Sequence, residues 1–229
     1  MKLEDKPASS TLCVHGGDRP DPATGALEAP LHLSSAFAFD DAAQAAGAFR
    51  GENEHFIYGR WGNPTVDALE HKLAALEAPG VNGPVEGYSA CATASGMAAI
   101  SATLVTLCES GDSIVAPRSM YGESARLLRE RLPRFGITTT FVDQTDPDAY
   151  ERSIGPRTKV LYVETPANPT LTVTDLAAVT AIARRHGLTV VADNTFATPY
   201  CQRPLAHGVD LVIHSMTKAI GGHGDAIGG

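Results

Sequence analysis

Several classes of protein are excluded by what this 229-residue sequence has little of. It contains no apolar run long enough to span a bilayer, and its polar start (Lys2, Glu4, Asp5, Lys6) lacks the apolar core of a secretion signal. Basic residues number 18 against 26 acidic ones, and the net charge of −8 argues against a nucleic-acid surface or a polybasic membrane patch. We therefore expect a globular protein of the cytoplasm.

Cysteine is also scarce, and no pattern of metal ligands is evident. The four cysteines lie far apart without a Cys-x-x-Cys pair, so we expect reduced thiols with no common role. His214 and His223 have no further ligands at the spacing of a zinc site, and no metal is expected. The cysteines are Cys13, Cys91, Cys108 and Cys201.

Three signatures of other enzyme classes are missing. No Gly-x-Gly-x-x-Gly follows a strand, which argues against a nicotinamide dehydrogenase. The segment 87–91 lacks the second glycine of a nucleophile elbow, and no Gly-Lys-Ser/Thr phosphate loop occurs.

What the chain does contain is an alternation of short apolar runs and amphipathic stretches. The residues before Phe56 are rich in Ala, Pro and Gly and predict an extended arm with a short helix at 41–49. Apolar residues at helical spacing after Pro64 predict a further helix. Strands alternating with helices then indicate an α/β fold with a mostly parallel sheet sandwiched by helices. The predicted strands are 87–90, 113–116, 138–142, 159–164, 189–193 and 211–214, and the predicted helices are 95–107, 122–135, 147–154 and 175–186.

The most informative residue is Lys218, in the segment His-Ser-Met-Thr-Lys that follows an apolar strand. The ends of such strands are where open α/β sheets bind their ligands. Small hydroxyl residues precede the amine and glycines follow it, so this lysine is a candidate for forming an imine. The alternative is a strand-end lysine that extends to solvent.

Asp193 ends another apolar run, 25 positions before Lys218. That separation accommodates one strand–crossover–strand unit, which would bring both groups to one edge of a parallel sheet. A lysine paired with a carboxylate suits pyridoxal phosphate, because the acid keeps the pyridine nitrogen protonated. A strand-end Asp is otherwise often a helix cap or a turn former.

The segment Ser95-Gly96-Met97 opens an apolar helix. Backbone N–H groups at a helix start, beside a glycine, can bind an anion. A plain N-cap role for Ser95 explains the same residues equally well.

Five ordered segments together resemble the Cys/Met-metabolism family of pyridoxal-phosphate enzymes. This family includes cystathionine γ-synthase, cystathionine γ-lyase, methionine γ-lyase and O-acetylhomoserine sulfhydrylase. The resemblance implies a large domain like that of fold-type-I aminotransferases at 58–229, which binds pyridoxal phosphate, preceded by an N-terminal arm at 1–57. The segments are Tyr-Gly-Arg-Trp-Gly-Asn-Pro-Thr (58–65), Ala-Ser-Gly-Met-Ala-Ala-Ile (94–100), Glu-Thr-Pro-Ala-Asn-Pro-Thr (164–170), Ala-Asp-Asn-Thr (192–195) and the lysine segment (214–224).

The resemblance also implies roles for individual residues. Catalysis falls to Lys218, assisted by Tyr121, which stacks on the cofactor ring. Asn168 lies near the ring hydroxyl and the substrate carboxylate. Tyr58 and Arg60 reach the phosphate of a neighbouring subunit, which implies a homo-oligomer (a dimer of dimers) with shared sites. The cofactor-binding set is Ser95, Gly96, Met97, Tyr121, Asp193, Ser215, Thr217, Lys218, Tyr58 and Arg60, and the substrate-binding set is Asn168 and Tyr58. Read without the resemblance, Tyr121 and Asn168 are ordinary turn or core residues, and Tyr58 with Arg60 is a solvated surface pair.

The reaction implied is γ-elimination by a carbon–sulfur lyase acting on methionine, cystathionine or a related amino acid. The alternative is a γ-replacing transferase that uses an O-acylated homoserine. Methionine γ-lyases carry a cysteine directly after the Tyr-Gly of the stacking tyrosine, whereas this chain has Glu123 there.

Family members continue past the lysine into a smaller C-terminal domain that carries the arginine for the substrate carboxylate. The sequence ends at Gly229, so we expect that domain to be absent from this chain. A second interpretation is therefore a non-catalytic remnant that binds cofactor or associates with intact subunits.

Overall fold

The computed structural model describes residues 9–78 and 87–229 in two compact units. Residues 9–76 and 87–92 form the first unit, and residues 77–78 and 93–229 form the second. None of the helices within these described ranges is long and apolar enough to cross a membrane. The boundary expected between residues 57 and 58 stays a prediction.

The first unit contains three helices: α1 (Ser9–His15), α2 (Ala42–Phe49) and α3 (Pro64–Glu77), the last residue of which belongs to the second unit. Helix α2 starts where predicted, because the Asp41 carboxylate caps it by accepting the Gln44 N–H at 2.7 Å. Helix α1 was not predicted. It buries none of its residues, so it has no apolar face for a sequence pattern to reveal.

The second unit is built on a five-stranded sheet in the order β2-β1-β3-β4-β5, with all neighbours parallel. This confirms the α/β prediction and the predicted crossover between the Asp193 and Lys218 segments, since β4 and β5 are adjacent. The strands are β1 (Ser113–Pro117), β2 (Thr138–Val142), β3 (Thr158–Glu164), β4 (Thr189–Asp193) and β5 (Leu211–Ile213).

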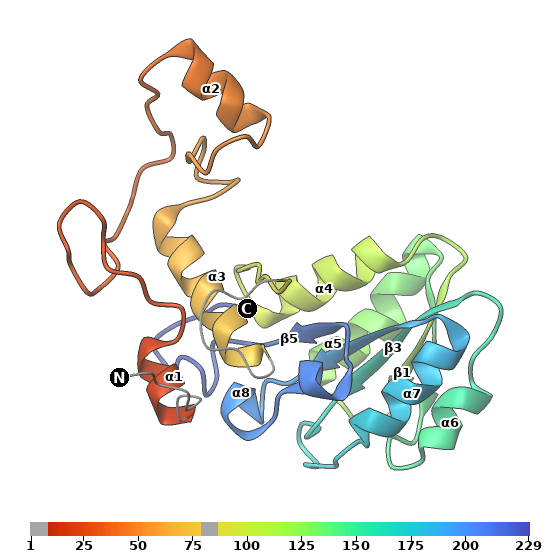
Figure 1. Ribbon diagram of the computed structural model, residues 1–229. Coiled ribbons are helices and arrows are strands. Elements are labelled where there is room, and N and C mark those ends of the chain that lie inside the picture. The colour runs from red at the N-terminus through yellow and green to blue at the C-terminus, as the bar shows by residue number, and fades with distance from the viewer. Residues whose placement is uncertain (1–8, 79–86) are drawn as a thin grey trace. The chain divides into compact units, whose positions relative to one another are not determined.

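Helices cover both faces of this sheet, as its apolar residues require. On one face, residues of α4 (Gly96–Leu107) and of the segment that begins with α5 (Gly122–Arg126) pack on the β1 and β3 side chains Ile114 and Tyr162. On the other, α6 (Pro147–Arg152) and α7 (Leu176–His186) pack on Val163 and Val190. Figure 1 shows β1, β3 and β5 of this sheet between α4 and α7. The connection from β4 to β5 contains the short helices α8 (Thr198–Cys201) and η3 (Pro204–His207).

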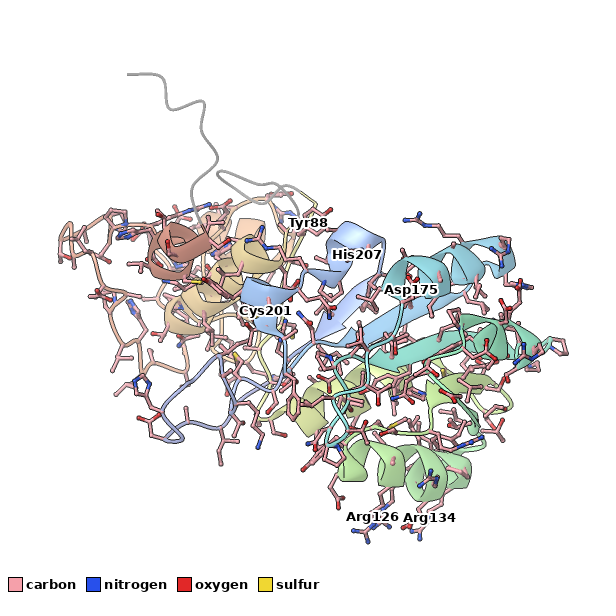
Figure 2. The ribbon with its side chains drawn as sticks, turned by 90° about the horizontal axis from the view of Figure 1, so that it is seen from below. Tyr88, Arg126, Arg134, Asp175, Cys201 and His207 are labelled. Carbon is pink, nitrogen blue, oxygen red and sulfur yellow. The ribbon has the colours of Figure 1, made fainter. Side chains whose placement is uncertain are left out.

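The predicted helix 122–135 is helical over the predicted range but changes type along its length. It begins as the α-helix α5 and continues as a π-helical turn η1 (Leu127–Arg131) and a 3-10 turn η2 (Leu132–Phe135). Pro133 lacks the N–H that a continuous α-helix needs, so the last turn changes its geometry. Figure 2 shows Arg126 and Arg134 projecting from the outer side of this segment.

The predicted strand 87–90 in the first unit is wrong, because the described residues at these positions form no strand. Gly87 has a φ of +85°, which no β-strand adopts. Further along the same segment, the Ala92 N–H donates to the Glu70 carboxylate at 2.7 Å rather than to a strand.

A buried polar network ties together the carboxyl ends of β3, β4 and β5. Oε1 of Glu77 lies 2.5 Å from Nε2 of His214 and accepts a hydrogen bond from the Asn194 side chain at 3.2 Å. The Gln202 side chain donates to Asn194 and to the carbonyl of Thr165, both at 2.9 Å. Because buried polar groups are costly when unpaired, this network favours one arrangement of the three strand ends.

We expect Glu77→Ala to lower the free energy of unfolding by roughly 2–4 kcal/mol, because it removes the acceptor for two buried groups, His214 and Asn194. Denaturant unfolding measures the change. Glu151→Ala is a matched control, since Glu151 also pairs with a histidine (His186, 3.0 Å) but at the exposed surface. Equal stability losses in the two variants would contradict the role given to the network.

Candidate functional site

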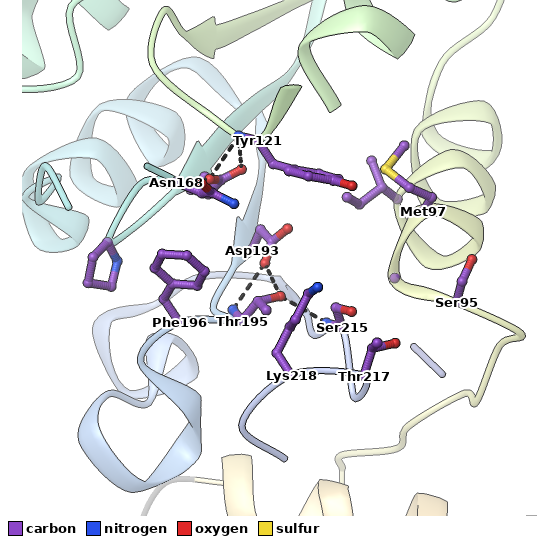
Figure 3. Close-up of a pocket in the computed structure, with 14 residues that line it drawn as sticks. Ser95, Met97, Tyr121, Asn168, Asp193, Thr195, Phe196, Ser215, Thr217 and Lys218 are labelled. Atoms are coloured by element: carbon purple, nitrogen blue, oxygen red, sulfur yellow. Dashed lines mark hydrogen bonds between the residues drawn. The ribbon is translucent and has the colours of Figure 1, made fainter. Parts of the chain in front are cut away.

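A cavity of about 200 Å³ opens at the carboxyl ends of β3, β4 and β5, beside the start of α4. The sequence-predicted residues Ser95, Gly96, Met97, Tyr121, Asn168, Asp193, Ser215, Thr217 and Lys218 all line it (Figure 3). The structure therefore brings together nine positions spread over more than half of the chain.

Asp193 is the acidic centre of the cavity. It ends β4 and is 7 % exposed. Its Oδ1 accepts the N–H of Thr195 at 3.0 Å and the Thr195 hydroxyl at 2.5 Å. Burial raises the pKa of this carboxyl group, and the two bonds from Thr195, together with the charge of His214, act in the opposite direction.

Thr195 is a site residue that our sequence reasoning missed. Besides holding Asp193, its Oγ1 accepts the Ser215 N–H at 2.8 Å. One hydroxyl group thus connects the end of β4 to the segment that leads from β5 to the lysine. A hydroxyl residue two positions after a strand-end Asp is a local signal for the first contact, because such pairs form side-chain turns. Nothing local signals the second contact.

Lys218 lies at the exposed side of the cavity, and its side chain extends toward the space between Asp193 and Tyr121 (Figure 3). The strand β5 before it ends at Ile213, and a turn at 215–221 then carries the lysine. Hydrogen bonds hold this turn, from the Lys218 N–H to Ser215 O (3.2 Å) and from the Gly221 N–H to Met216 O (2.8 Å). A Cβ atom at Gly221 would lie 2.7 Å from Met216 O, which explains a glycine after the lysine.

The start of α4 forms another wall. The Ser95 hydroxyl caps the helix by accepting the Ala98 N–H at 3.1 Å, as one of the two sequence interpretations predicted. A Cβ atom at Gly96 would lie 2.7 Å from Cβ of Ser215, so only glycine permits this close approach. First-turn N–H groups such as those of Gly96 and Met97 have no acceptor within the helix. This wall is therefore suited to an anion.

Tyr121 and Asn168 enter the cavity from two different loops that share one buried group. The Tyr121 N–H donates to both carboxylate oxygens of Glu164 at 2.9 Å, and the Asn168 N–H donates to Oε1 at 2.7 Å (Figure 3). Glu164 ends β3, is 4 % exposed and pairs in register with Asp193 on β4. Burial raises the pKa of Glu164 to about 7, and the charge of Asp193 adds to that shift. Glu164 begins the 164–170 segment of the family resemblance, which implied no role for it.

Tyr58 and Arg60 belong to the first unit. The Arg60 guanidinium lies 5.4 Å from the centre of the Tyr58 ring and 5.9 Å from that of Trp61. This is the distance range of a cation–π interaction, and it keeps the two predicted residues together. Their proposed reach to a neighbouring subunit stays a prediction.

The cavity thus combines an exposed amine, a buried carboxylate, an aromatic ring and a helix start. Such a set suits a flat ligand that carries a carbonyl group, a basic ring nitrogen and a phosphate. Within the described part of the chain, no cluster of three or more His, Cys, Asp or Glu side chains is arranged to hold a metal ion.

Comparison with known proteins agrees with this chemistry. Residues 10–229 match the family described as Cys/Met metabolism PLP-dependent enzymes. The chain is 45 % identical to L-methionine gamma-lyase of Fusobacterium nucleatum subsp. polymorphum over 220 residues, covering 96 % of this chain and 53 % of that protein. It is 42 % identical to O-acetyl-L-homoserine sulfhydrylase of Leptospira meyeri, covering 96 % and 48 %.

Solved structures give the same result. The metB structure from Corynebacterium glutamicum superposes with a TM-score of 0.87 at 36 % identity, covering 97 % of this chain and 54 % of that one. An O-acetylhomoserine (thiol)-lyase (metY) from Campylobacter jejuni, solved with N′-pyridoxyl-lysine-5′-monophosphate, gives 0.88 at 33 % identity, covering 97 % and 53 %. The chain spans about half the length of the relatives that it matches.

The raised pKa of Glu164 predicts a pH dependence of stability. Between its ordinary pKa of 4.5 and its folded value of about 7, the folded protein keeps a proton that the unfolded chain releases. The free energy of unfolding should therefore fall as the pH rises through this window, by at most about 1.4 kcal/mol per pH unit. Glu164→Gln should lack this component in urea unfolding, whereas the exposed control Glu130→Gln should keep it. Parallel curves for wild type and Glu164→Gln would contradict the shift.

Proposed function

The chain belongs to the Cys/Met metabolism family of PLP-dependent enzymes, and we propose that its cavity binds pyridoxal phosphate through Lys218 and Asp193. One observation carries the proposal: Asp193 ends β4, Lys218 follows the neighbouring parallel strand β5, and both residues line the same cavity. When bound, pyridoxal phosphate supplies an electron sink for negative charge at the substrate Cα.

Asp193 fits the ring-nitrogen role. Its Oδ1 is held by Thr195, so the carboxylate is oriented before any ligand arrives. A cation next to this buried group would favour its ionised form, in opposition to the effect of burial. Asp193 would in this way keep a proton on the ring nitrogen.

Lys218 fits the roles of covalent anchor and proton carrier. Its exposed side chain is within reach of an incoming ligand, and the hydrogen-bonded turn fixes its backbone. Once the substrate amine takes its place, Lys218 would remove the proton at Cα.

The phosphate would be held by the N–H groups of Gly96 and Met97 and by the hydroxyls of Ser215 and Thr217. The close approach of Gly96 to Ser215, where a Cβ atom would lie 2.7 Å from Ser215 Cβ, supports this, because it brings the helix start and the Ser215 hydroxyl together at one side of the cavity. Thr217 is positioned by Gly228, whose N–H donates to its hydroxyl oxygen at 3.1 Å. Tyr121 would stack on the ring, and Asn168 would bind its hydroxyl and the substrate carboxylate.

For the whole protein we propose γ-elimination, a carbon–sulfur lyase reaction on methionine, cystathionine or a related amino acid. Proton transfers at Cα and Cβ would release the group on Cγ, and water would then yield a 2-oxo acid and ammonia. The similarity to methionine γ-lyases supports this choice. A γ-replacing transferase that uses an O-acylated homoserine is the second candidate. It is supported by the similarity to a sulfhydrylase and by Glu123, an exposed residue 3.8 Å from Arg126, where methionine γ-lyases carry cysteine.

Lys218→Ala should abolish the visible absorbance of the lysine-bound cofactor and its fixation by borohydride, because the variant has no amine in the cavity. Absorbance spectra and mass spectrometry of the reduced protein measure both effects. Lys159→Ala is the matched control, since Lys159 is an exposed lysine near the opposite end of β3. Retention of fixed cofactor in Lys218→Ala would refute the assignment of the anchor.

The same preparations distinguish the reactions. We expect wild-type protein to release a 2-oxo acid from methionine or cystathionine, with no release by Lys218→Ala. A product formed only when a thiol is added to O-acetylhomoserine would favour the transferase instead. Cofactor binding without turnover of any of these substrates would favour a non-catalytic remnant.

We also propose a homo-oligomer, a dimer of dimers, in which Tyr58 and Arg60 of one subunit bind the phosphate of the next. The cation–π distance between them supports a common role. Mixing Arg60→Ala with Lys218→Ala should restore activity in hybrid oligomers, because some sites then contain both intact residues. A mixture as inactive as its parents would count against a shared site.

A further inference from the structure

Glu164 is a buried acid of the cavity to which the proposed reaction gives no part. It differs from Asp193 in what it binds: Asp193 accepts hydrogen bonds from Thr195, two positions further along the chain, whereas Glu164 accepts them from two separate loops. The cost of burying a carboxylate is high unless it is hydrogen-bonded. The hydrogen bonds from the Tyr121 and Asn168 backbones therefore offset the cost of burying Glu164.

Neighbouring residues of the two loops have contacts of their own: the Ser119 and Thr170 hydroxyl groups lie 2.9 Å apart, and the Leu171 N–H donates to Ala167 O at 2.7 Å. The backbone N–H groups of Tyr121 and Asn168 themselves donate to Glu164. Tyr121 is the N-cap residue of α5, but its side chain makes no capping hydrogen bond. The residue is 41 % exposed. Asn168 lies in the turn after β3, between that strand and Pro169. Charged acceptors form the stronger class of hydrogen bond, so Glu164 in its ionised form is suited to setting both backbones at once.

We propose that Glu164 is a positioning residue, whose carboxylate clamps the backbones of Tyr121 and Asn168 and thereby holds their side chains against the bound cofactor. The inference rests on the proposed function, because it assumes that the cofactor occupies this cavity. Glu164 does not itself react. Its effect passes through the Tyr121 ring and the Asn168 amide.

The geometry distinguishes two substitutions. Glu164→Ala removes every acceptor. Glu164→Gln keeps one oxygen, and since Oε1 alone accepts from both Tyr121 and Asn168, it can preserve much of the clamp while removing the charge. The Gln side-chain N–H₂ group would then occupy the former Oε2 position and face the Tyr121 N–H, which is also a donor. The backbone hydrogen bond of Tyr121 should therefore be weakened more than that of Asn168.

Residue-resolved hydrogen exchange on the full chain tests the clamp without any cofactor. In Glu164→Ala, the Tyr121 and Asn168 amides should exchange at least about ten-fold faster, and in Glu164→Gln mainly the Tyr121 amide should do so. The Arg118 amide, which donates to Val142 O at 2.7 Å, should not change. Gln144→Ala is the matched control. Gln144 is also buried and binds Ser119 on the same loop, so this variant should leave Asn168 unaffected.

A second readout tests the consequence for the cofactor. The visible circular dichroism of bound cofactor reports how rigidly its ring is held, and it should decrease more in Glu164→Ala than in Glu164→Gln while borohydride still fixes cofactor to Lys218. Unchanged exchange at both amides, faster exchange with unchanged dichroism, or identical effects of Ala and Gln would each overturn the proposal. Should Glu164→Ala not fold, Glu164→Gln decides between these outcomes. Wild-type protein that binds no cofactor would refute the proposed function. The hydrogen-exchange test needs no cofactor, so failure of the clamp and failure of the proposed function can be told apart.

Discussion

The parallel pairing of β3, β4 and β5 is the constraint on which the site depends. Their register sets Glu164 beside Asp193, and Asp193 beside Ile213, the last strand residue before the lysine segment. Because helices cover both faces of the sheet, the strand ends are where polar side chains can meet a ligand. A slip of one residue in this register would turn Asp193 to the opposite face of the sheet.

Around these strand ends the protein places a second layer of buried polar groups. Glu77, His214 and Asn194 join the strand ends from one direction, and Thr195 links Asp193 to the segment after β5. In a medium of low polarity such contacts are strong when complete and costly when broken. Side chains that line the cavity are therefore held by hydrogen bonds to neighbouring polar groups. Buried residues of this kind fix the position of cavity side chains, which is a different role from taking part in a reaction.

Much of the architecture follows from local patterns. The sheet strands 113–117 to 211–213 were predicted within about two residues, because buried parallel strands appear as apolar runs. The failures have local causes too. Pro133 changes the type of the last turn in a helical segment whose range was predicted, Gly87 leaves the strand region, and α1 buries nothing that a pattern could show. At Pro133 and Gly87, the backbone of one residue outweighed the pattern of side chains. At α1, there was no apolar pattern to read.

Sequence by itself determined the α/β class, the family, and the nine cavity residues that motifs identify, because motif order and strand periodicity are local properties. Only the tertiary structure decided that Lys218 lies at an exposed rim, that Thr195 joins two strand ends, and that Glu164 binds two loops at once. These features are contacts between segments from four to more than forty residues apart. They depend on strand order and register, which spacing along the chain does not encode.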